Sequence, residues 1–165
     1  MNKATFGAGC FWGIEAAFRN TVGVTATAVG YLGGSTDSPR YEDVCTGRTG
    51  HAEVVEVIFD PTKTDYGTLL NIFWENHDPT TLNRQGPDIG SQYRSAIFFH
   101  SENQRELART SKDMLDEDGR FGRPIVTEIT AATMFFAAED YHQQYLEKRG
   151  MASCLIPTAT RNAAV

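Results

Sequence analysis

The order of hydrophobic periods along the first 100 residues constrains the fold of this chain more than any other feature. Apolar residues at every second position predict strands, whereas apolar residues three and four positions apart predict helices. Residues 51–59 form the clearest strand, because β-branched residues occupy both of its faces. A second amphipathic stretch begins near Asp65, which is a suitable helix cap, and stops at Pro79. The chain therefore mixes both kinds of element rather than repeating one.

Up to His100, the predicted order is strand, helix, strand, strand, helix, strand. The strands are residues 3–8, 25–32, 51–59 and 93–100, and the first helix is residues 11–20. This is the split βαβ order of a ferredoxin-like core, an α/β (α+β) two-layer sandwich. The appended elements are a helix that opens with a Ser101–Gln104 capping box and ends at Gly119, a strand over 124–131 and a helix over 138–149. Residues 78–92 show no period, and a connection of that length is often functional.

Composition is informative mainly through what it excludes. The 165 residues fit one domain, and 41% hydrophobic residues suffice for a core. A net charge of −6 without a run of Lys or Arg argues against nucleic acid and anionic membranes as partners. No apolar run approaches the ~18 residues of a membrane span, and the first residues do not resemble a signal peptide. We therefore expect a cytoplasmic protein.

The three cysteines narrow the possible chemistry. Cys10, Cys45 and Cys154 form no C-x-x-C pair, which excludes a zinc ribbon and a thioredoxin-type motif. Each is then a buried small residue or a reactive thiol, and we interpret Cys45 as a buried structural thiol. The four histidines show no paired spacing that predicts a metal site, and we expect no cofactor. His142 could still support an active site indirectly.

The segment Gly-Ala-Gly-Cys-Phe-Trp-Gly joins the first predicted strand to the first predicted helix. It fits the dinucleotide fingerprint poorly, because it is one residue too long and lacks the acidic ribose partner about 20 residues on. As a thiol site it fits better, since Cys10 would lie at a helix N-terminus, which favours a thiolate. Phe11 and Trp12 would be two exposed aromatics forming an apolar cup. From this segment alone, a core role for all three residues is equally open.

This segment resembles the signature of class A peptide methionine sulfoxide reductases. Three further stretches share the resemblance, and they read YEDVCTGRTGHAEVVEV from Tyr41, DPTTLNRQGPDIGSQYRS from Asp78 and AEDYHQQYL from Ala138. Together they extend to about Arg149 and occur in the family's order. The resemblance implies an α/β sandwich with a ferredoxin-like core, and reduction of the S epimer of methionine sulfoxide, both free and protein-bound.

The resemblance also implies roles for individual residues. Cys10 is the nucleophile and becomes a sulfenic acid, while Phe11 and Trp12 hold the S-methyl group of the substrate. Glu53 matches the family's acidic residue, and its position on an apolar strand face predicts a raised pKa, although Glu56 lies on an apolar face too. The remaining matches are Tyr41 and Tyr93, which would bind the sulfoxide oxygen, and Asp88, which would bind the substrate backbone or order the loop.

Turnover requires a second thiol to reduce the sulfenic acid. Cys154 lies where the family often carries its resolving cysteine, although this chain has fewer glycines around it and a nearby Pro157. We expect a Cys10–Cys154 disulfide that thioredoxin reduces, with Cys45 as the competing resolver. The expected organisation is a single reductase domain over residues 1–165, with residues 150–165 a flexible tail, acting as a monomer.

Two other classes of function remain open at this point. A cysteine-dependent hydrolase or acyltransferase would use Cys10 with a histidine base and pass through a thioester. A non-enzymatic module would bind methionine-containing partners through Phe11 and Trp12 without turnover. Covalent trapping distinguishes the first of these from a reductase, and the absence of turnover distinguishes the second.

Overall fold

The computed structural model describes residues 1–150 of the chain. The helices and 3-10 turns are α1 (Phe11–Arg19), α2 (Tyr41–Cys45), α3 (Tyr66–Glu75), η1 (Ser91–Tyr93), α4 (Glu102–Asp118), η2 (Asp140–His142) and α5 (Tyr145–Lys148). The strands are β1 (Asn2–Ala8), β2 (Val24–Leu32), β3 (Ala52–Phe59), β4 (Arg84–Gln85), β5 (Asp88–Ile89), β6 (Ser95–Phe99), β7 (Glu128–Ala131) and β8 (Phe136–Ala137).

The central sheet has the order β7-β6-β1-β3-β2-β8 within the described residues. β3 inserts between β1 and β2 and pairs antiparallel with both, and β6 pairs antiparallel with the other side of β1. This is the split βαβ arrangement, so the predicted ferredoxin-like core is confirmed. β7 extends the sheet in parallel to β6, and β8 closes its other edge beside β2.

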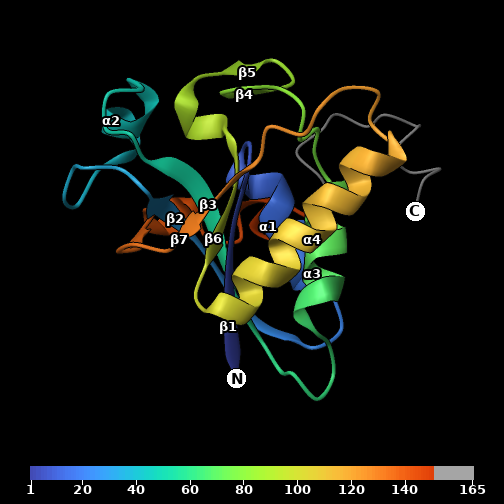
Figure 1. Ribbon diagram of the computed structural model, residues 1–165. Coiled ribbons are helices and arrows are strands. Elements are labelled where there is room, and N and C mark those ends of the chain that lie inside the picture. The colour runs from blue at the N-terminus through green and yellow to red at the C-terminus, as the bar shows by residue number, and fades with distance from the viewer. Residues whose placement is uncertain (151–165) are drawn as a thin grey trace.

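One face of the sheet carries the main core. Figure 1 shows α1, α3 and α4 grouped on one side of the strands, and buried side chains such as Phe6, Val55 and Phe73 fill the space between them. The opposite face holds a smaller cluster that includes Val54 and Phe98. The alternation along β3 therefore places Glu53, like Val55, on the face that α1 covers.

The helix ends follow the capping chemistry of the sequence. Asp65 accepts a hydrogen bond from the backbone N–H of Thr68, 2.7 Å away, and Gly119 ends α4 with φ +67°. Ser101 likewise accepts from the backbone N–H of Gln104. The predicted capping box is only half formed, because the side chain of Gln104 accepts from the N–H of His100 instead of that of Ser101. Within residues 1–150, no helix is both long and apolar enough to cross a membrane.

The structure corrects the prediction of a continuous helix over residues 138–149. The segment instead forms η2, an extended Gln143, a left-handed Gln144 with φ +53°, and the short α5. The reason is the Gln143 side chain, which accepts from the N–H of Val29 and donates to its carbonyl on β2. These bonds to the sheet edge hold the backbone out of a helix. The strand predicted over 93–100 is also shorter, since Tyr93 belongs to η1.

The aperiodic stretch 78–92 contains the β4–β5 hairpin, which turns at Gly86 and Pro87. The hairpin and α2 lie at the end of the sheet away from the N-terminus (Figure 1). Neither α2 nor β8 was predicted, because five-residue and two-residue elements leave no readable period. The predicted strand over 124–131 is confirmed only for its second half, β7.

Candidate active site

Cys10 lies at the junction between the central strand β1 and helix α1. The chain leaves β1 at Ala8, turns through Gly9 with φ +88°, and enters α1 with Cys10 as the N-cap residue. The Cys10 side chain is half-buried. The helix dipole and the N–H groups of the first turn make this position favourable for an anion. The predicted placement of Cys10 at a helix N-terminus is confirmed.

Glu53 reaches the same helix terminus from β3. Its Oε1 accepts a hydrogen bond from the backbone N–H of Phe11, 3.3 Å away, while its Oε2 has no hydrogen-bond partner among the described residues. The Glu53 residue is 1% exposed. Burial raises the pKa of Glu53 to about 8, against the opposing effect of the Phe11 N–H, and the nearby charge of Asp88 raises it further. The raised pKa predicted from the strand pattern is therefore confirmed.

Two tyrosine hydroxyls share this environment. Tyr41 begins α2, where its backbone N–H donates to Glu139, and Tyr93 ends η1. Burial raises the pKa of both phenols, that of Tyr93 to about 12, and the charge of Glu53 contributes to each. The charge of Cys10 also acts on Tyr93. Both tyrosines are therefore neutral hydrogen-bond donors close to Glu53.

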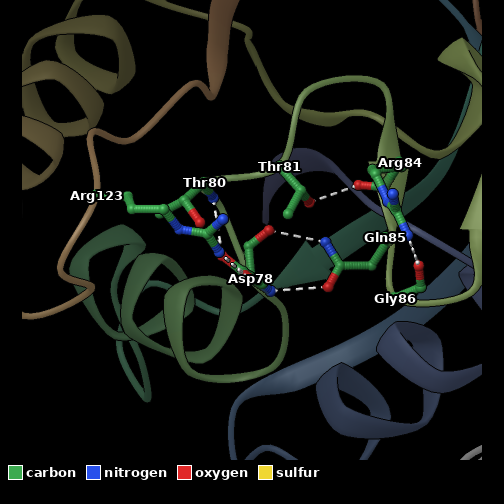
Figure 2. Close-up of polar contacts among 7 residues, drawn as sticks. All are labelled: Asp78, Thr80, Thr81, Arg84, Gln85, Gly86 and Arg123. Atoms are coloured by element: carbon green, nitrogen blue, oxygen red, sulfur yellow. Dashed lines mark hydrogen bonds and ion pairs between the residues drawn. The ribbon is translucent and has the colours of Figure 1, made fainter.

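The β4–β5 hairpin covers the junction at Gly9. A Cβ built on Gly9 would lie 2.6 Å from Cγ of Gln85, so only glycine fits beneath the hairpin. The Gln85 side chain accepts from the backbone N–H of Asp78 and donates to its carbonyl, each at 2.8 Å (Figure 2). Arg123 adds a 3.4 Å ion pair to the Asp78 carboxylate. These contacts fix the hairpin that carries Asp88.

Phe11 and Trp12 lie in different environments, although both belong to the first turn of α1. Phe11 is 1% exposed, so the expectation of two exposed aromatics is wrong for this residue, whose ring packs into the main core. Trp12 is half-buried, and its Nε1–H donates to Nδ1 of His142 at 3.0 Å. The Trp12 ring also stacks on Tyr145, with centroids 3.7 Å apart and 7° between the planes.

His142 lies among the aromatic residues of the site, although the sequence suggested only an indirect role for it. It is 1% exposed and contacts the rings of Phe11, Trp12 and Tyr41. Because its Nδ1 accepts from Trp12, its proton sits on Nε2, which has no hydrogen-bond partner within residues 1–150 and faces Glu139 at 4.0 Å. Burial lowers the pKa of His142, which keeps the ring neutral.

Cys45 differs from its interpretation as a buried structural thiol. Its side chain is exposed at the end of α2, and it forms a hydrogen bond with the Tyr41 hydroxyl. Partial desolvation of the sulfur raises the pKa of the Cys45 thiol against the opposing Tyr41 hydrogen bond, and nearby carboxylates raise it further, so less of it is present as the reactive thiolate. Cys154 lies outside the described residues. Among residues 1–150, no cluster of His, Cys, Asp and Glu could hold a metal ion.

A family model described as peptide methionine sulfoxide reductase matches residues 2–165. The chain belongs to the peptide methionine sulfoxide reductase family. One relative is the peptide methionine sulfoxide reductase MsrA of Geobacter metallireducens, 61% identical over 154 residues, which cover 93% of this chain and 95% of the relative. The chain is accordingly an oxidoreductase that reduces methionine sulfoxide.

Solved structures of this reductase family have the same fold. Mxr1 from Saccharomyces cerevisiae in reduced form matches with a TM-score of 0.83 and 39% identity, covering 90% of this chain and 86% of that one. A second Mxr1 structure, described as a complex with Trx2, matches with a TM-score of 0.59 and 27% identity over 87% of this chain and 84% of that one. A protein with this reductase fold has therefore been solved in complex with another protein, Trx2.

Proposed function

We propose that this reductase acts on the S epimer of methionine sulfoxide, free or in proteins, with Cys10 as nucleophile and Glu53 as proton donor. The observation that carries the proposal is the hydrogen bond from the Phe11 N–H to Glu53, because Phe11 follows the nucleophile directly. It brings a buried carboxyl group with a pKa of about 8 to the helix terminus where the thiol lies. A general acid works best when its pKa is close to the operating pH.

The first chemical step balances without a cofactor. The Cys10 sulfur attacks the sulfoxide sulfur, and Glu53 gives its proton to the sulfoxide oxygen. The oxygen ends on Cys10 as a sulfenic acid, methionine leaves with its sulfur reduced, and the thiol proton returns to Glu53. Tyr41 and Tyr93, as neutral donors, stabilise the charge that develops on the oxygen.

The remaining site residues bind the substrate. Trp12 provides an apolar wall for the S-methyl group, which offers only burial and dispersion contacts for recognition. Phe11 supports this wall from the core side, in contact with His142. Asp88, on the fixed hairpin, is half-buried and available to a substrate amino group or backbone. Trp12 and Asp88 thus act on the substrate rather than on the transferred oxygen, and Phe11 acts through Trp12.

Regeneration uses a second thiol and an external reductant. The Cys154 thiol displaces water from the Cys10 sulfenic acid, which leaves a Cys10–Cys154 disulfide. A thioredoxin dithiol then reduces that disulfide, as the structural precedent with Trx2 supports. We propose that residues 1–165 act as one monomeric domain whose C-terminal tail carries Cys154, and that the enzyme works in the cytoplasm, where thiols stay reduced.

A thiol count after one turnover tests this scheme. Fully reduced protein is mixed with the S epimer of a methionine sulfoxide peptide, quenched by alkylation and mapped by mass spectrometry. We expect one methionine per chain, the loss of two thiols and a linked Cys10–Cys154 peptide, with no reaction of the R epimer. The control is Cys10→Ser, which should form no methionine.

Other products would contradict specific parts of the scheme. A Cys10–Cys45 peptide would keep the reaction but overturn Cys154 as the resolving residue. A thioester on Cys10 would point to acyl transfer, and unchanged thiols with no methionine would point to a binding module.

A further inference from the structure

A buried carboxyl group outside the reaction centre links α1 to the segment that carries Tyr145. Glu15 lies one helical turn after Trp12 and is 1% exposed. Its Oε2 accepts from the hydroxyl of Thr27 on β2 at 2.9 Å, and its Oε1 accepts from the backbone N–H of Gln144 at 2.7 Å. Both carboxyl oxygens are therefore used, one to hold α1 on the sheet and one to hold Gln144.

Gln144 needs such a partner, because its backbone conformation is unfavourable. Its φ of +53° lies in the left-handed region, which is unfavourable for a residue with a side chain, so contacts with its surroundings must offset the cost. Gln143 is tied to Val29 by its side chain, so the turn is held at both of these positions. The carboxyl group of Glu15 is the partner of Gln144 itself.

The turn at Gln144 positions two residues that contact Trp12. His142, which accepts the Trp12 indole N–H, lies two residues before Gln144, and Tyr145, which stacks on the indole, follows it directly. A cavity of about 160 Å³ borders Trp12, Glu15 and Gln144, so packed side chains do not cover the whole of the Trp12 surface. The hydrogen bond to His142 and the stack on Tyr145 therefore help to set the orientation of the indole.

A second side-chain link, between α1 and α5, is weak. Arg19 pairs with Glu147 at 2.8 Å, but the Glu147 side chain is 62% exposed. Exposed ion pairs contribute little to stability, whereas a hydrogen bond to a buried charged or polar group contributes more. Loss of the Glu15 bond should therefore release Gln144 even when the Arg19 pair remains.

We propose that Glu15 is a positioning residue for substrate binding, because it holds the Gln144 turn that places Tyr145 and His142 against Trp12. This inference rests on the proposed role of Trp12 as the wall for the substrate methyl group. Glu15 itself touches neither the substrate nor Cys10 in this assignment. Its effect should appear as weaker substrate binding and a changed Trp12 environment, not as a lost chemical step.

The two tryptophans of the chain provide a direct readout. The indole N–H of Trp12 donates to His142, and that of Trp74 donates to Ser111 in the α3–α4 region, so an NMR spectrum has one reporter and one internal control. In Glu15→Ala we expect the Trp12 indole signal to shift while the Trp74 signal stays in place. We expect the KM for a methionine sulfoxide peptide, with dithiothreitol as reductant, to rise roughly tenfold and kcat to change less.

Matched variants separate positioning from a general loss of structure. Glu15→Gln keeps an oxygen that can accept from Gln144, so it should behave like the unmodified chain. Thr27→Val removes only the other partner of Glu15 and should leave the Trp12 signal in place. An unmoved Trp12 signal or unchanged KM in Glu15→Ala would overturn the proposal, as would equal impairment in Glu15→Gln.

A further variant keeps the test decisive if Glu15→Ala does not fold. Glycine adopts a positive φ without strain, so Gln144→Gly should restore both folding and substrate binding to Glu15→Ala. Equal impairment in the two backgrounds would contradict the role of the turn. If the unmodified chain reduces no methionine sulfoxide, the proposed function fails, whereas the Trp12 signal still reports on Glu15 independently of activity.

Discussion

The backbone nitrogen of Phe11 lies 3.3 Å from Oε1 of Glu53, so the first turn of α1 and a buried acidic residue of β3 are joined directly. Two effects oppose each other at this bond. The helix N-terminus and its N–H group favour an ionised carboxylate, whereas burial favours the neutral acid. Burial prevails, because the pKa of Glu53 rises to about 8. Glu53 is therefore mostly protonated at neutral pH, and it lies beside the helix N-terminus, where the position of Cys10 favours a thiolate.

The rate of methionine formation should depend on the protonation of Glu53. Below pH 8 the proton donor is present, and above it the protonated fraction falls as pH rises. We expect single-turnover rates to fall above about pH 8 in the unmodified chain. In Glu53→Gln the rate should be lower and this alkaline decrease should be absent. An identical decrease in Glu53→Gln would show that another group is titrating.

The same carboxyl group should make stability depend on pH. The ordinary pKa of a glutamate, 4.5, applies to the unfolded chain, and the pKa of Glu53 in the folded chain is about 8. Between these values the folded chain holds a proton that the unfolded chain has released, so the stability that this group contributes is complete below about pH 4.5 and falls as pH rises towards 8. Urea unfolding should therefore show Glu53→Gln gaining stability relative to the unmodified chain between about pH 5 and 8. A constant difference across this range would contradict the buried-acid assignment.

Removal of either tyrosine hydroxyl should slow the chemical step. Tyr41→Phe and Tyr93→Phe each delete a neutral donor near Glu53, and the loss of one such donor typically lowers kcat by about a hundredfold to a thousandfold. We expect values at or below the lower end, because each hydroxyl can partly replace the other, and a larger loss in the double variant. Tyr141→Phe, an exposed position, is the control. Unchanged single-turnover rates in both single variants would remove the tyrosines from the mechanism.

Serine variants of the two other cysteines should separate resolution from chemistry. Cys154→Ser should form one methionine per chain and a persistent sulfenic acid, without turnover by thioredoxin. Cys45→Ser should keep full turnover, because burial and the neighbouring carboxylates disfavour the Cys45 thiolate. Steady-state rates with thioredoxin, together with sulfenic acid trapping, measure both. The reverse pattern would make Cys45 the resolving residue.

A methyl group at Gly9 should displace the hairpin and reduce activity. Gly9→Ala combines a positive φ with a Cβ 2.6 Å from the Gln85 side chain, so we expect a loss of roughly 1–3 kcal/mol in the free energy of unfolding. Gly86→Ala is the matched control, since Gly86 also has a positive φ but no atom lies within 4 Å of its added Cβ. The Gly86 variant should lose less stability and keep its activity. Equal losses of stability in the two variants would show that the positive φ alone, and not the contact with Gln85, causes the loss.

The helices and strands that were predicted well carry their own signals. Asp65 and Gly119 mark helix ends because their side-chain or backbone chemistry acts within one turn. β3 was readable because both of its faces are buried, and its alternation put Glu53 on an apolar face, although it did the same for Glu56. These features depend only on neighbouring residues, so a short stretch of sequence is enough to predict them.

The features that the sequence did not predict depend on contacts between segments far apart in the chain. The helix expected over 138–149 is interrupted because Gln143 bonds to Val29, more than 100 positions earlier, and no periodicity reports that contact. The burial of Phe11 and the exposure of Cys45 likewise depend on what packs against α1 and α2. The motif around His142 and Tyr145 could be located in the sequence, but their arrangement around Trp12 could not.

Because β1 is hydrogen-bonded by β3 on one side and by β6 on the other, the strand that leads to Cys10 is held in the middle of the sheet up to Ala8. In the proposed cycle, Cys10 is thus the thiol that stays in place. In that cycle methionine leaves before the second thiol forms the disulfide with Cys10, and the reductant then acts on this disulfide. Such a cycle follows ping-pong kinetics, in which the oxidising and reducing substrates never occupy the enzyme together.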